Sequence, residues 1–369
     1  MVEKIVDLEG KIEEFLKNLE SESQFEFKNT VKGNTENGLN LRLGYSCYAL
    51  KIKYTIGLWD KLENNTKNDW ISFLNSFQKK IDKFPTNSFV DDALLKGYDN
   101  FSTFQKYKNL LKTSLNRINL LDYKGLDHQL KTAIRAETKQ AISSLFQIGS
   151  KNEKIYFDFE KDEEDIANFL QNLNWSKPWS SGADYANLCL FNSTQIVDNA
   201  EQIKVLRKQI KKYLNVNDGF YYSGNRPQQT QLINGAMKVF SGLKWINSEI
   251  HYPQKIIDYC LSTNVNDEGC DLVDTVFVLY EASKQVNYRK NEVVLYMNNI
   301  KEIIFSRFYP EYGGFSYYRN QSQKYYYGLV TSNGENYPDI HGTILLTWAL
   351  SMIFDFSENE NYSWKILKP

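Results

Sequence analysis

Hydrophobic and polar positions divide the chain into two kinds of helical segment. In one kind, such as "NDWISFLNSFQKKI" and "AEQIKVLRKQIKKYL", apolar residues recur every three to four positions and the remainder are polar. This pattern predicts helices with one face in water. Segments of the other kind are rich in small residues and apolar around most of their circumference, which is typical of helices buried on all sides.

The second kind of segment recurs along the whole chain. The segments begin at Gly44, Phe89, Ile134, Gly182, Gln229, Gly269 and Pro338. Successive starts are 45, 45, 48, 47, 40 and 69 residues apart, which is typical of repeated helix pairs. We therefore predict an all-α fold, an α/α toroid (barrel) of six to seven helical hairpins. An open solenoid is the alternative, and the polar starts of the buried helices favour closure around a shared cavity.

Two regions depart from the repeat. The long last interval contains glycines 313, 314, 328 and 334 among Tyr, Phe and Val, which predicts a small β-hairpin-like insertion near 311–335 over the cavity mouth. Residues 1–30 contain an amphipathic helix with one apolar stripe, formed by Ile5, Leu8, Ile12, Phe15, Leu16 and Leu19. We expect this helix to pack on the toroid within a single domain, 1–369, because its acidic balance disfavours docking on a membrane surface.

Composition excludes several classes of protein. Hydrophobic residues make up 42% and charged residues 24%, as in globular chains. The 44 basic and 45 acidic residues nearly cancel, so we expect no nucleic-acid partner. The longest apolar run, "GTILLTWALSMIF", is shorter than the roughly 20 residues of a transmembrane helix. Four scattered cysteines and no run resembling a signal peptide favour a cytoplasmic protein, whose oligomeric state these features leave open.

Aromatic residues reach 15%, with 25 Tyr and 22 Phe. Tyrosine gathers in three turn-rich stretches, 219–225, 313–320 and 324–330. These are either aromatic surface loops or the wall of a binding cavity, where flat rings stack on sugars or cations.

In a toroid the starts of the inner helices meet at one end, and the polar residues there form our set of site residues. They are Tyr45, Tyr48, Asp91, Asp92, Arg135, Glu137, Asp184, Asn187, Gln231, Asn234, Asp271, Asp274, Asp339 and His341, joined by Tyr222, Arg226, Tyr317 and Tyr326 from the tyrosine-rich stretches. Any single Asp or Asn at a helix start can simply cap the helix. For the set as a whole we favour a polar cavity that binds substrate.

Asp271 and Asp274 are the strongest catalytic candidates. They lie three residues apart, so their side chains project to one side of a helix. Mutual repulsion and exclusion of water would raise the affinity of one for its proton and make it a general acid. Alternatively, Asp271 caps the helix and Asp274 pairs with Arg135 or with another cation of the inner helices. His341 is an acid or base candidate that Asp339 could orient, or else a core histidine with satisfied hydrogen bonds.

The "GGF" at 313–315, followed by a helix that opens with Asp339 and His341, resembles class II terpenoid cyclases and protein prenyltransferase β subunits. The cyclase signature Asp-x-Asp-Asp-Thr is similar to 271–275, where Val273 occupies the place of the family's proton donor. The prenyltransferase zinc ligands are Asp, Cys and His; Asp274 and His341 match two of them, with Val276 at the cysteine's place. The start of the same helix, 340–343, is also similar to lanthionine cyclases.

This resemblance implies an enzyme that acts on an isoprenoid or lipid-like substrate in a central, aromatic-lined cavity. We expect no cofactor, because zinc at Cys270, Asp274 and His341 would require Cys270 to replace the family's cysteine. The alternatives are a glycan-active toroid of polysaccharide lyase or hydrolase type and a non-catalytic toroid that binds a glycan or peptide. For a glycan, "FYYSGNRPQQTQ" would supply Asn225, Arg226 and Gln228.

Overall fold

The computed structural model describes residues 8–101, 125–266, 269–358 and 363–369. It is mostly helical, and each strand in the described part is two residues long. This confirms the all-α class.

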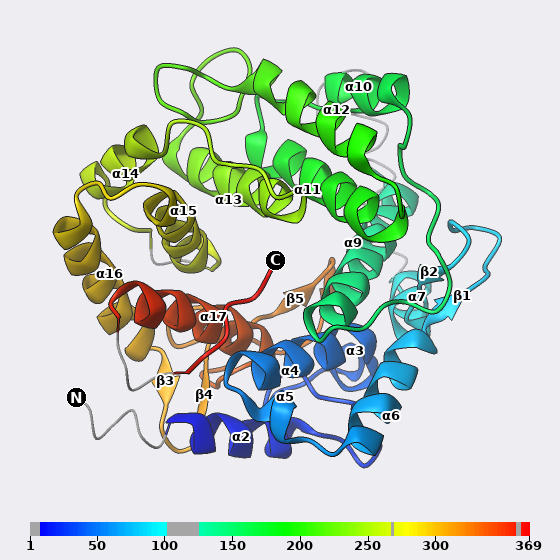
Figure 1. Cartoon of the computed structure of the whole chain (residues 1–369). Coiled ribbons are helices and arrows are strands. Elements are labelled where there is room, and N and C mark those ends of the chain that lie inside the picture. Colours follow the sequence, from blue (N-terminus) through cyan, green and yellow to red (C-terminus); the bar gives the residue numbers. More distant parts are fainter. Residues whose placement is uncertain (1–7, 102–124, 267–268, 359–362) are drawn as a thin grey trace.

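Six helices form the inner part of the molecule, and we call them the inner helices. They are α4 (Leu43–Thr55), α9 (Leu126–Gln147), α11 (Pro178–Gln195), α13 (Gln229–Trp245), α15 (Asp271–Gln285) and α17 (Ile340–Phe356). Each contacts the next in this order, and α17 contacts α4, so the series of contacts closes on itself (Figure 1).

The remaining elements lie around the inner helices or join them (Figure 1). The helices are α2 (Leu8–Leu19), α3 (Glu36–Asn40), α5 (Leu58–Lys61), α6 (Asn64–Asn75), α7 (Asp92–Asp99), α10 (Glu163–Asn172), α12 (Ala200–Ile210), η1 (Lys211–Tyr213), α14 (Pro253–Ser262) and α16 (Lys290–Phe305). The strands are β1 (Gln78–Lys79), β2 (Ser88–Phe89), β3 (Phe308–Tyr309), β4 (Gly314–Phe315), β5 (Tyr325–Tyr326) and β6 (Leu329–Val330).

Burial separates the two kinds of helix as their sequence patterns predict. Helix α15 buries twelve of its fifteen residues, including the run from Leu272 to Tyr280. Helix α12 buries only Val205, Leu206, Gln209 and Ile210 and presents its charged residues to solvent. The apolar stripe of α12 faces inward because removing apolar surface from water is the dominant favourable term in packing.

Three of the seven predicted starts of buried helices differ from the structure. Gly182 lies one turn inside α11, which begins at Pro178. The segment from Phe89 begins as strand β2 and continues as the short helix α7, which contacts α3 and α9 rather than joining the closed series. The segment from Ile134 lies inside α9, which begins eight residues earlier at Leu126. The first two turns of α9 expose Asp127, His128 and Lys131, so they lack the apolar pattern of a buried helix.

Short strands occur where a β-like insertion was predicted. Strands β3–β4 and β5–β6 form antiparallel pairs, with Tyr325 opposite Val330 in the second pair. A further pair, β1–β2, was not predicted. The 323–339 stretch is fastened to the segment before α4: Thr30 Oγ1 donates to the Pro338 carbonyl at 2.7 Å and Thr35 Oγ1 to the Val330 carbonyl at 2.7 Å.

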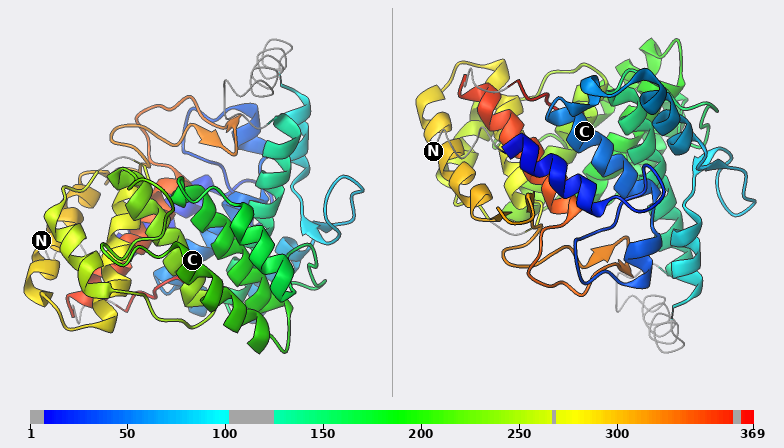
Figure 2. Two further views of the ribbon diagram at one scale, coloured as in Figure 1. Left: turned by 90° about the horizontal axis from the view of Figure 1, so that it is seen from above. Right: turned by 90° about the horizontal axis from the view of Figure 1, so that it is seen from below.

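The two ends of the inner helices are covered by different segments. The 323–339 stretch lies at their starts, which we call the head end, whereas the C-terminal segment lies at the opposite tail end (Figure 2). At the tail end the Lys365 N–H donates to Thr55 of α4 and the Lys368 N–H donates to Gln147 of α9.

Helix α2 buries the predicted stripe from Leu8 to Leu19, while Ile5 lies outside the described residues. This helix contacts β4, and Trp364 donates to Glu9 at 2.6 Å. In the described part of the chain, no helix has both the length and the apolar character needed to cross a membrane.

Candidate functional site

The start of α15 carries two carboxyl groups in different surroundings. Asp271 accepts a hydrogen bond from Asn234 of α13 at 2.8 Å and another from Asn266. Both carboxyl oxygens of Asp271 therefore have an amide donor.

Asp274 lies one turn further along α15 and is only 1% exposed. Its Oδ2 atom has no hydrogen-bond partner among the described residues. Burial raises the pKa of Asp274 to about 7; the positive charge of Lys238 opposes this shift, and the Asp271 charge adds to it. Asp274 therefore holds its proton at pH values where an ordinary aspartate has lost it.

His341, in the first turn of α17, lies between two tyrosine rings. Its ring stacks on Tyr48 of α4 with centroids 4.9 Å apart and an interplanar angle of 1°, and on Tyr317 at 4.8 Å and 27°. Burial lowers the pKa of His341 to about 4, and the charge of Lys238 adds to this effect. The imidazole is thus neutral near pH 7, and its Nδ1 atom has no partner among the described residues.

Tyr317 links His341 to the start of α15, because its hydroxyl lies 3.2 Å from Cys270 Sγ. Its backbone is fixed on both sides: the Tyr317 carbonyl accepts from Arg307 Nη1 at 2.6 Å, and its N–H donates to Asp339 Oδ2 at 2.8 Å. A Cβ atom at Gly342 would lie 2.3 Å from the Tyr317 nitrogen, so only glycine allows this stretch to approach α17.

Asp339 supports the site rather than entering it. Its Oδ1 accepts from Gly342 N–H at 2.7 Å and caps α17, while its Oδ2 also accepts from Gln323 N–H at 3.0 Å. Burial raises the pKa of Asp339 to about 6, against the opposing effect of these backbone donors. These hydrogen bonds go to backbone N–H groups, and Asp339 is linked to the His341 ring only through Tyr317, which stacks on that ring.

Glu137 of α9 provides a further buried carboxyl group at the head end. It accepts from the Tyr326 hydroxyl at 2.9 Å, and its Oε2 has no partner among the described residues. Burial raises its pKa well above the usual range. Tyr326 also contacts the rings of Tyr45 and Tyr48, and a Cβ at Gly44 would collide with its hydroxyl. The predicted residues Tyr45, Tyr48, Glu137 and Tyr326 therefore lie together.

Asp91 and Asp92 serve different purposes although they are adjacent. Asp91 caps α7 and accepts from the N–H groups of Arg42 and Leu43 at 2.7 and 3.0 Å, which fixes the start of α4. Asp92 forms an ion pair with Lys79 at 2.6 Å, and its side chain is 63% exposed. Asp91 thus acts as a helix cap, and Asp92 lies on the surface.

The other predicted residues make contacts away from this cluster. Arg135 pairs with Glu160 at 3.4 Å rather than with Asp274, so Lys238 of α13 is the inner-helix cation whose charge acts on Asp274. Arg226 and Tyr222 both bond to Asp218 in the loop before α13.

Three polar residues of the inner helices complete the predicted set. Gln231 accepts from Trp179 N–H at the start of α11. Asp184 and Asn187, also on α11, are half-buried. The hydrogen bond of Gln231 thus joins α13 to α11 and does not involve His341 or Asp274.

Sequence reasoning missed three lysines: Lys51 of α4, Lys139 of α9 and Lys238 of α13. The charge of Lys238 shifts the pKa of Asp274 on α15, His341 on α17 and Lys139 on α9, so these side chains converge from different helices. A signal was present in the sequence, because Lys238 stands in the otherwise uncharged stretch from Gln229 to Leu243.

The residues described here do not form a metal centre. Across residues 8–101, 125–266, 269–358 and 363–369, no group of three or more His, Cys, Asp or Glu side chains is arranged to hold a metal ion. The Cys270 thiol instead contacts Tyr317, and burial raises its pKa to about 11, which disfavours the thiolate that zinc requires.

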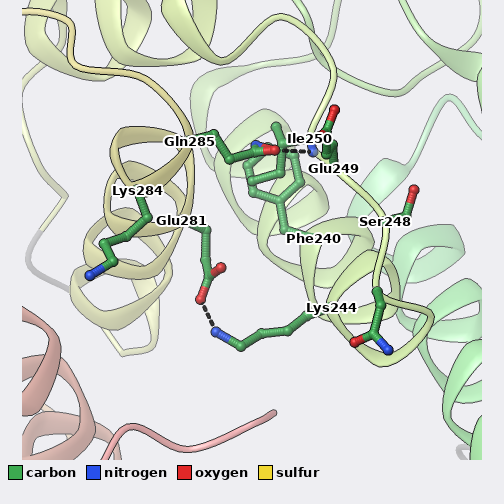
Figure 3. Close-up of a pocket in the computed structure, with 9 residues that line it drawn as sticks. Phe240, Lys244, Ser248, Glu249, Ile250, Glu281, Lys284 and Gln285 are labelled. Carbon is green, nitrogen blue, oxygen red and sulfur yellow. Dashed lines mark hydrogen bonds and ion pairs between the residues drawn. The ribbon is translucent and has the colours of Figure 1, made fainter.

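A pocket of about 290 Å³ lies at the tail end, between the last turns of α13 and α15 (Figure 3). It is lined by Phe240, Lys244, Asn247, Ser248, Glu249, Ile250, Glu281, Lys284 and Gln285. Lys244 pairs with Glu281, and Gln285 accepts from the Ile250 N–H at 2.9 Å (Figure 3). Since these polar groups satisfy one another, the pocket is the weaker candidate for a site.

A comparison with family models, curated proteins and solved structures finds no significant match. The function must therefore be inferred from the geometry of the head end.

Proposed function

We propose that the chain is an α/α toroid enzyme with its active site at the head end, and that its substrate is a glycan. The closed series of contacts among the six inner helices supports the toroid. The observation that carries the function is the pair Asp271 and Asp274, two neighbouring carboxyl groups in unlike environments. Amides donate to both oxygens of Asp271, whereas Asp274 is buried, has a raised pKa and leaves its Oδ2 without a partner among the described residues. Such a difference in environment typically identifies a general acid and its charged partner.

Cleavage of a glycosidic bond uses this pair directly. Asp274 gives its proton to the leaving oxygen as the bond from the anomeric carbon to that oxygen breaks. Asp271 stabilises the positive charge that develops on the sugar ring and takes the proton of the attacking water. Asn234 and Asn266 orient the Asp271 carboxyl group through their hydrogen bonds.

The surroundings of the pair fit a sugar better than a hydrocarbon. Tyr48, Tyr317 and His341 present flat rings, and Lys238, Asp274 and Glu137 add polar groups. Carbohydrates bind to such mixtures because the flat face of a sugar stacks on a ring while its hydroxyl groups form hydrogen bonds.

An isoprenoid or lipid-like substrate is the second candidate. It is favoured by the contact of Tyr326 with Tyr45 and Tyr48, since tyrosine faces stabilise the carbocations formed in isoprenoid chemistry. In that reaction Asp274 would protonate an alkene.

Turnover of defined substrates tests both candidates. Purified protein is incubated with neutral and acidic oligosaccharides, and separately with isoprenoid diphosphates, and products are measured by mass spectrometry. We expect cleavage of an oligosaccharide that is lost in Asp274→Asn. Turnover of an isoprenoid alone would support the second candidate. Binding of a glycan without turnover would support a non-catalytic toroid and contradict both.

A further inference from the structure

Three lysines of the inner helices lie further from the head end than the candidate catalytic residues. Lys51 follows Tyr48 by about one turn of α4, and Lys238 follows Asn234 by one turn of α13. Lys139 follows Glu137 by two residues on α9. The three lysines therefore come from three different inner helices, α4, α9 and α13.

The ammonium groups of these lysines approach one another. Lys51 donates to Ser143 of α9 at 2.8 Å, which places its end beside the helix that carries Lys139. After burial, the charges of Lys51 and Lys238 are the further causes that lower the pKa of Lys139. Because α13 contacts α11 and α15 rather than packing against α9, Lys139 and Lys238 must both extend toward the interior.

Counter-charges are scarce around this cluster. Lys139 and Lys238 form no hydrogen bond or ion pair with any residue in the described part of the chain. Asp274 is the carboxyl group on which Lys238 acts, and it holds its own proton up to about pH 7. Glu137 bonds to Tyr326. Lys139 and Lys238 are half-buried and so keep some surface open to solvent.

An ammonium group buried without a counter-charge either loses its proton or destabilises the fold, and a bound anion relieves both effects. We propose that Lys51, Lys139 and Lys238 form a binding site for an anionic group of the substrate, a carboxylate or a phosphate, below the Asp271–Asp274 pair. This deepens the proposed function and rests on its placement of the active site. In the glycan reaction the anion is the carboxylate of an acidic sugar; in the isoprenoid reaction it is a diphosphate.

Calorimetric titration of the full chain at low salt tests the site. The probes are pyrophosphate and D-glucuronate, with D-glucose as the neutral counterpart of glucuronate. The variants are Lys139→Met and Lys238→Met, which keep side-chain length and remove the charge. The control is Lys204→Met on α12, whose lysine is 77% exposed.

We expect the wild type to bind at least one anion, and each inner variant to weaken that binding by roughly tenfold or more, the worth of one hydrogen bond to a charged group. Lys204→Met should bind like the wild type. Preference for glucuronate over glucose identifies an acidic sugar as the source of the anion, and preference for pyrophosphate identifies a diphosphate. Absence of anion binding, or binding unchanged in both inner variants, would overturn the proposal.

Thermal melting without ligand provides a second test, which does not require a measured binding constant. Lys139→Met should melt at a higher temperature than the wild type in anion-free buffer, because a repelled, buried charge has been removed. Pyrophosphate should raise the melting temperature of the wild type more than that of the variant. A variant that melts lower than the wild type and responds equally to pyrophosphate would contradict the site. Neither experiment requires turnover, so an inactive protein would contradict only the proposed function.

Discussion

The two ends of the inner helices differ in whether their titratable side chains have partners. At the tail end Lys244 pairs with Glu281, Lys284 with Asp355 at 3.2 Å, and Tyr280 donates to the same Asp355 at 2.7 Å. At the head end Asp274, Glu137 and His341 each leave a polar atom without a partner among the described residues.

With the active site that we propose at the head end, this difference assigns stability to one end of the inner helices and function to the other. Buried polar groups in native proteins are nearly always hydrogen-bonded, and the exceptions call for a specific explanation. Paired charges at the tail end complete the packing, whereas unpaired groups at the head end are available to a ligand. A survey of ion pairs would not reveal the head end as a candidate site, because Asp274, Glu137 and His341 are identified by the partners that they lack.

Removing the candidate acid should have the largest effect. We expect Asp274→Asn to lower kcat by roughly 100-fold or more, the usual contribution of a general acid, with no fall in melting temperature. Glu281→Gln at the tail end is the control and should keep full activity. Equal activity of the two variants in a steady-state assay would remove the functional distinction between the ends.

The substitution Gly342→Ala should be the most destabilising change. The added methyl group of Gly342→Ala meets the Tyr317 backbone rather than a flexible side chain, so we expect about 2–3 kcal/mol of lost stability. Ser357→Ala, at the other end of α17, should stay within about 0.5 kcal/mol of the wild type. Urea unfolding measures both, and similar losses would show that the head end is no more tightly constrained than the tail end.

The pH dependence of stability should reveal the shifted pKa values of Asp274 and His341 separately. The pKa of folded Asp274 is about 7 against an ordinary value of 3.8, so the folded state binds more protons than the unfolded state in this window, and the contribution of Asp274 to stability falls as pH rises from 4 to 7. The folded pKa of His341 is about 4 against 6.5, so its contribution falls as pH drops from 6.5 to 4.

Because these slopes oppose each other, the variants must be compared with the wild type. Asp274→Asn should gain stability over the wild type as pH rises through this window, by on the order of 2–4 kcal/mol at pH 7. His341→Gln should gain over the wild type as pH falls. Melting curves at pH 4, 5, 6 and 7 test both trends, and parallel curves for all three proteins would mean that neither group is shifted.

Breaking a tail-end ion pair should have the smallest effect. Lys244 and Glu281 are 30% and 17% exposed, so solvent screens their attraction, and Lys244→Gln should cost less than about 1 kcal/mol. The measurement is urea unfolding at low and high salt, where the difference from the wild type should shrink as salt rises. If Lys244→Gln lost more than about 2 kcal/mol of stability, the tail-end ion pair would matter as much as the backbone contact at Gly342, and the expected difference between the ends would be contradicted.

The sequence pattern predicted those features that depend on local periodicity. The start of α13 at Gln229 is at the predicted residue, because apolar positions continue around the helix from that point. The extent of α9 could not be predicted in this way, since its first two turns are polar and only its second half is buried. Strand β2 was missed because Phe89 and Val90 carry the same apolar pattern as a helix start.

Site prediction had a different limit. Asp271, Asp274, His341 and Tyr317 were found because each stands at a helix start or in an aromatic loop. Lys51, Lys139 and Lys238 were not, because the side of a helix on which a lysine emerges becomes meaningful only when its neighbours are known. Arg135 shows the converse: its position in the pattern suggested the site, yet its side chain pairs with Glu160.

The contact of α17 with α4 joins parts of the chain that are made far apart in time. The hydrogen bond from the Thr30 hydroxyl to the Pro338 carbonyl can form only after the ribosome has added Pro338, which lies 308 residues later in the chain. During synthesis α4 is therefore exposed without one of its two inner neighbours until nearly the whole chain has emerged. Because contacts of such large sequence separation form slowly, we expect the nascent protein to depend on chaperones until α17 has been made.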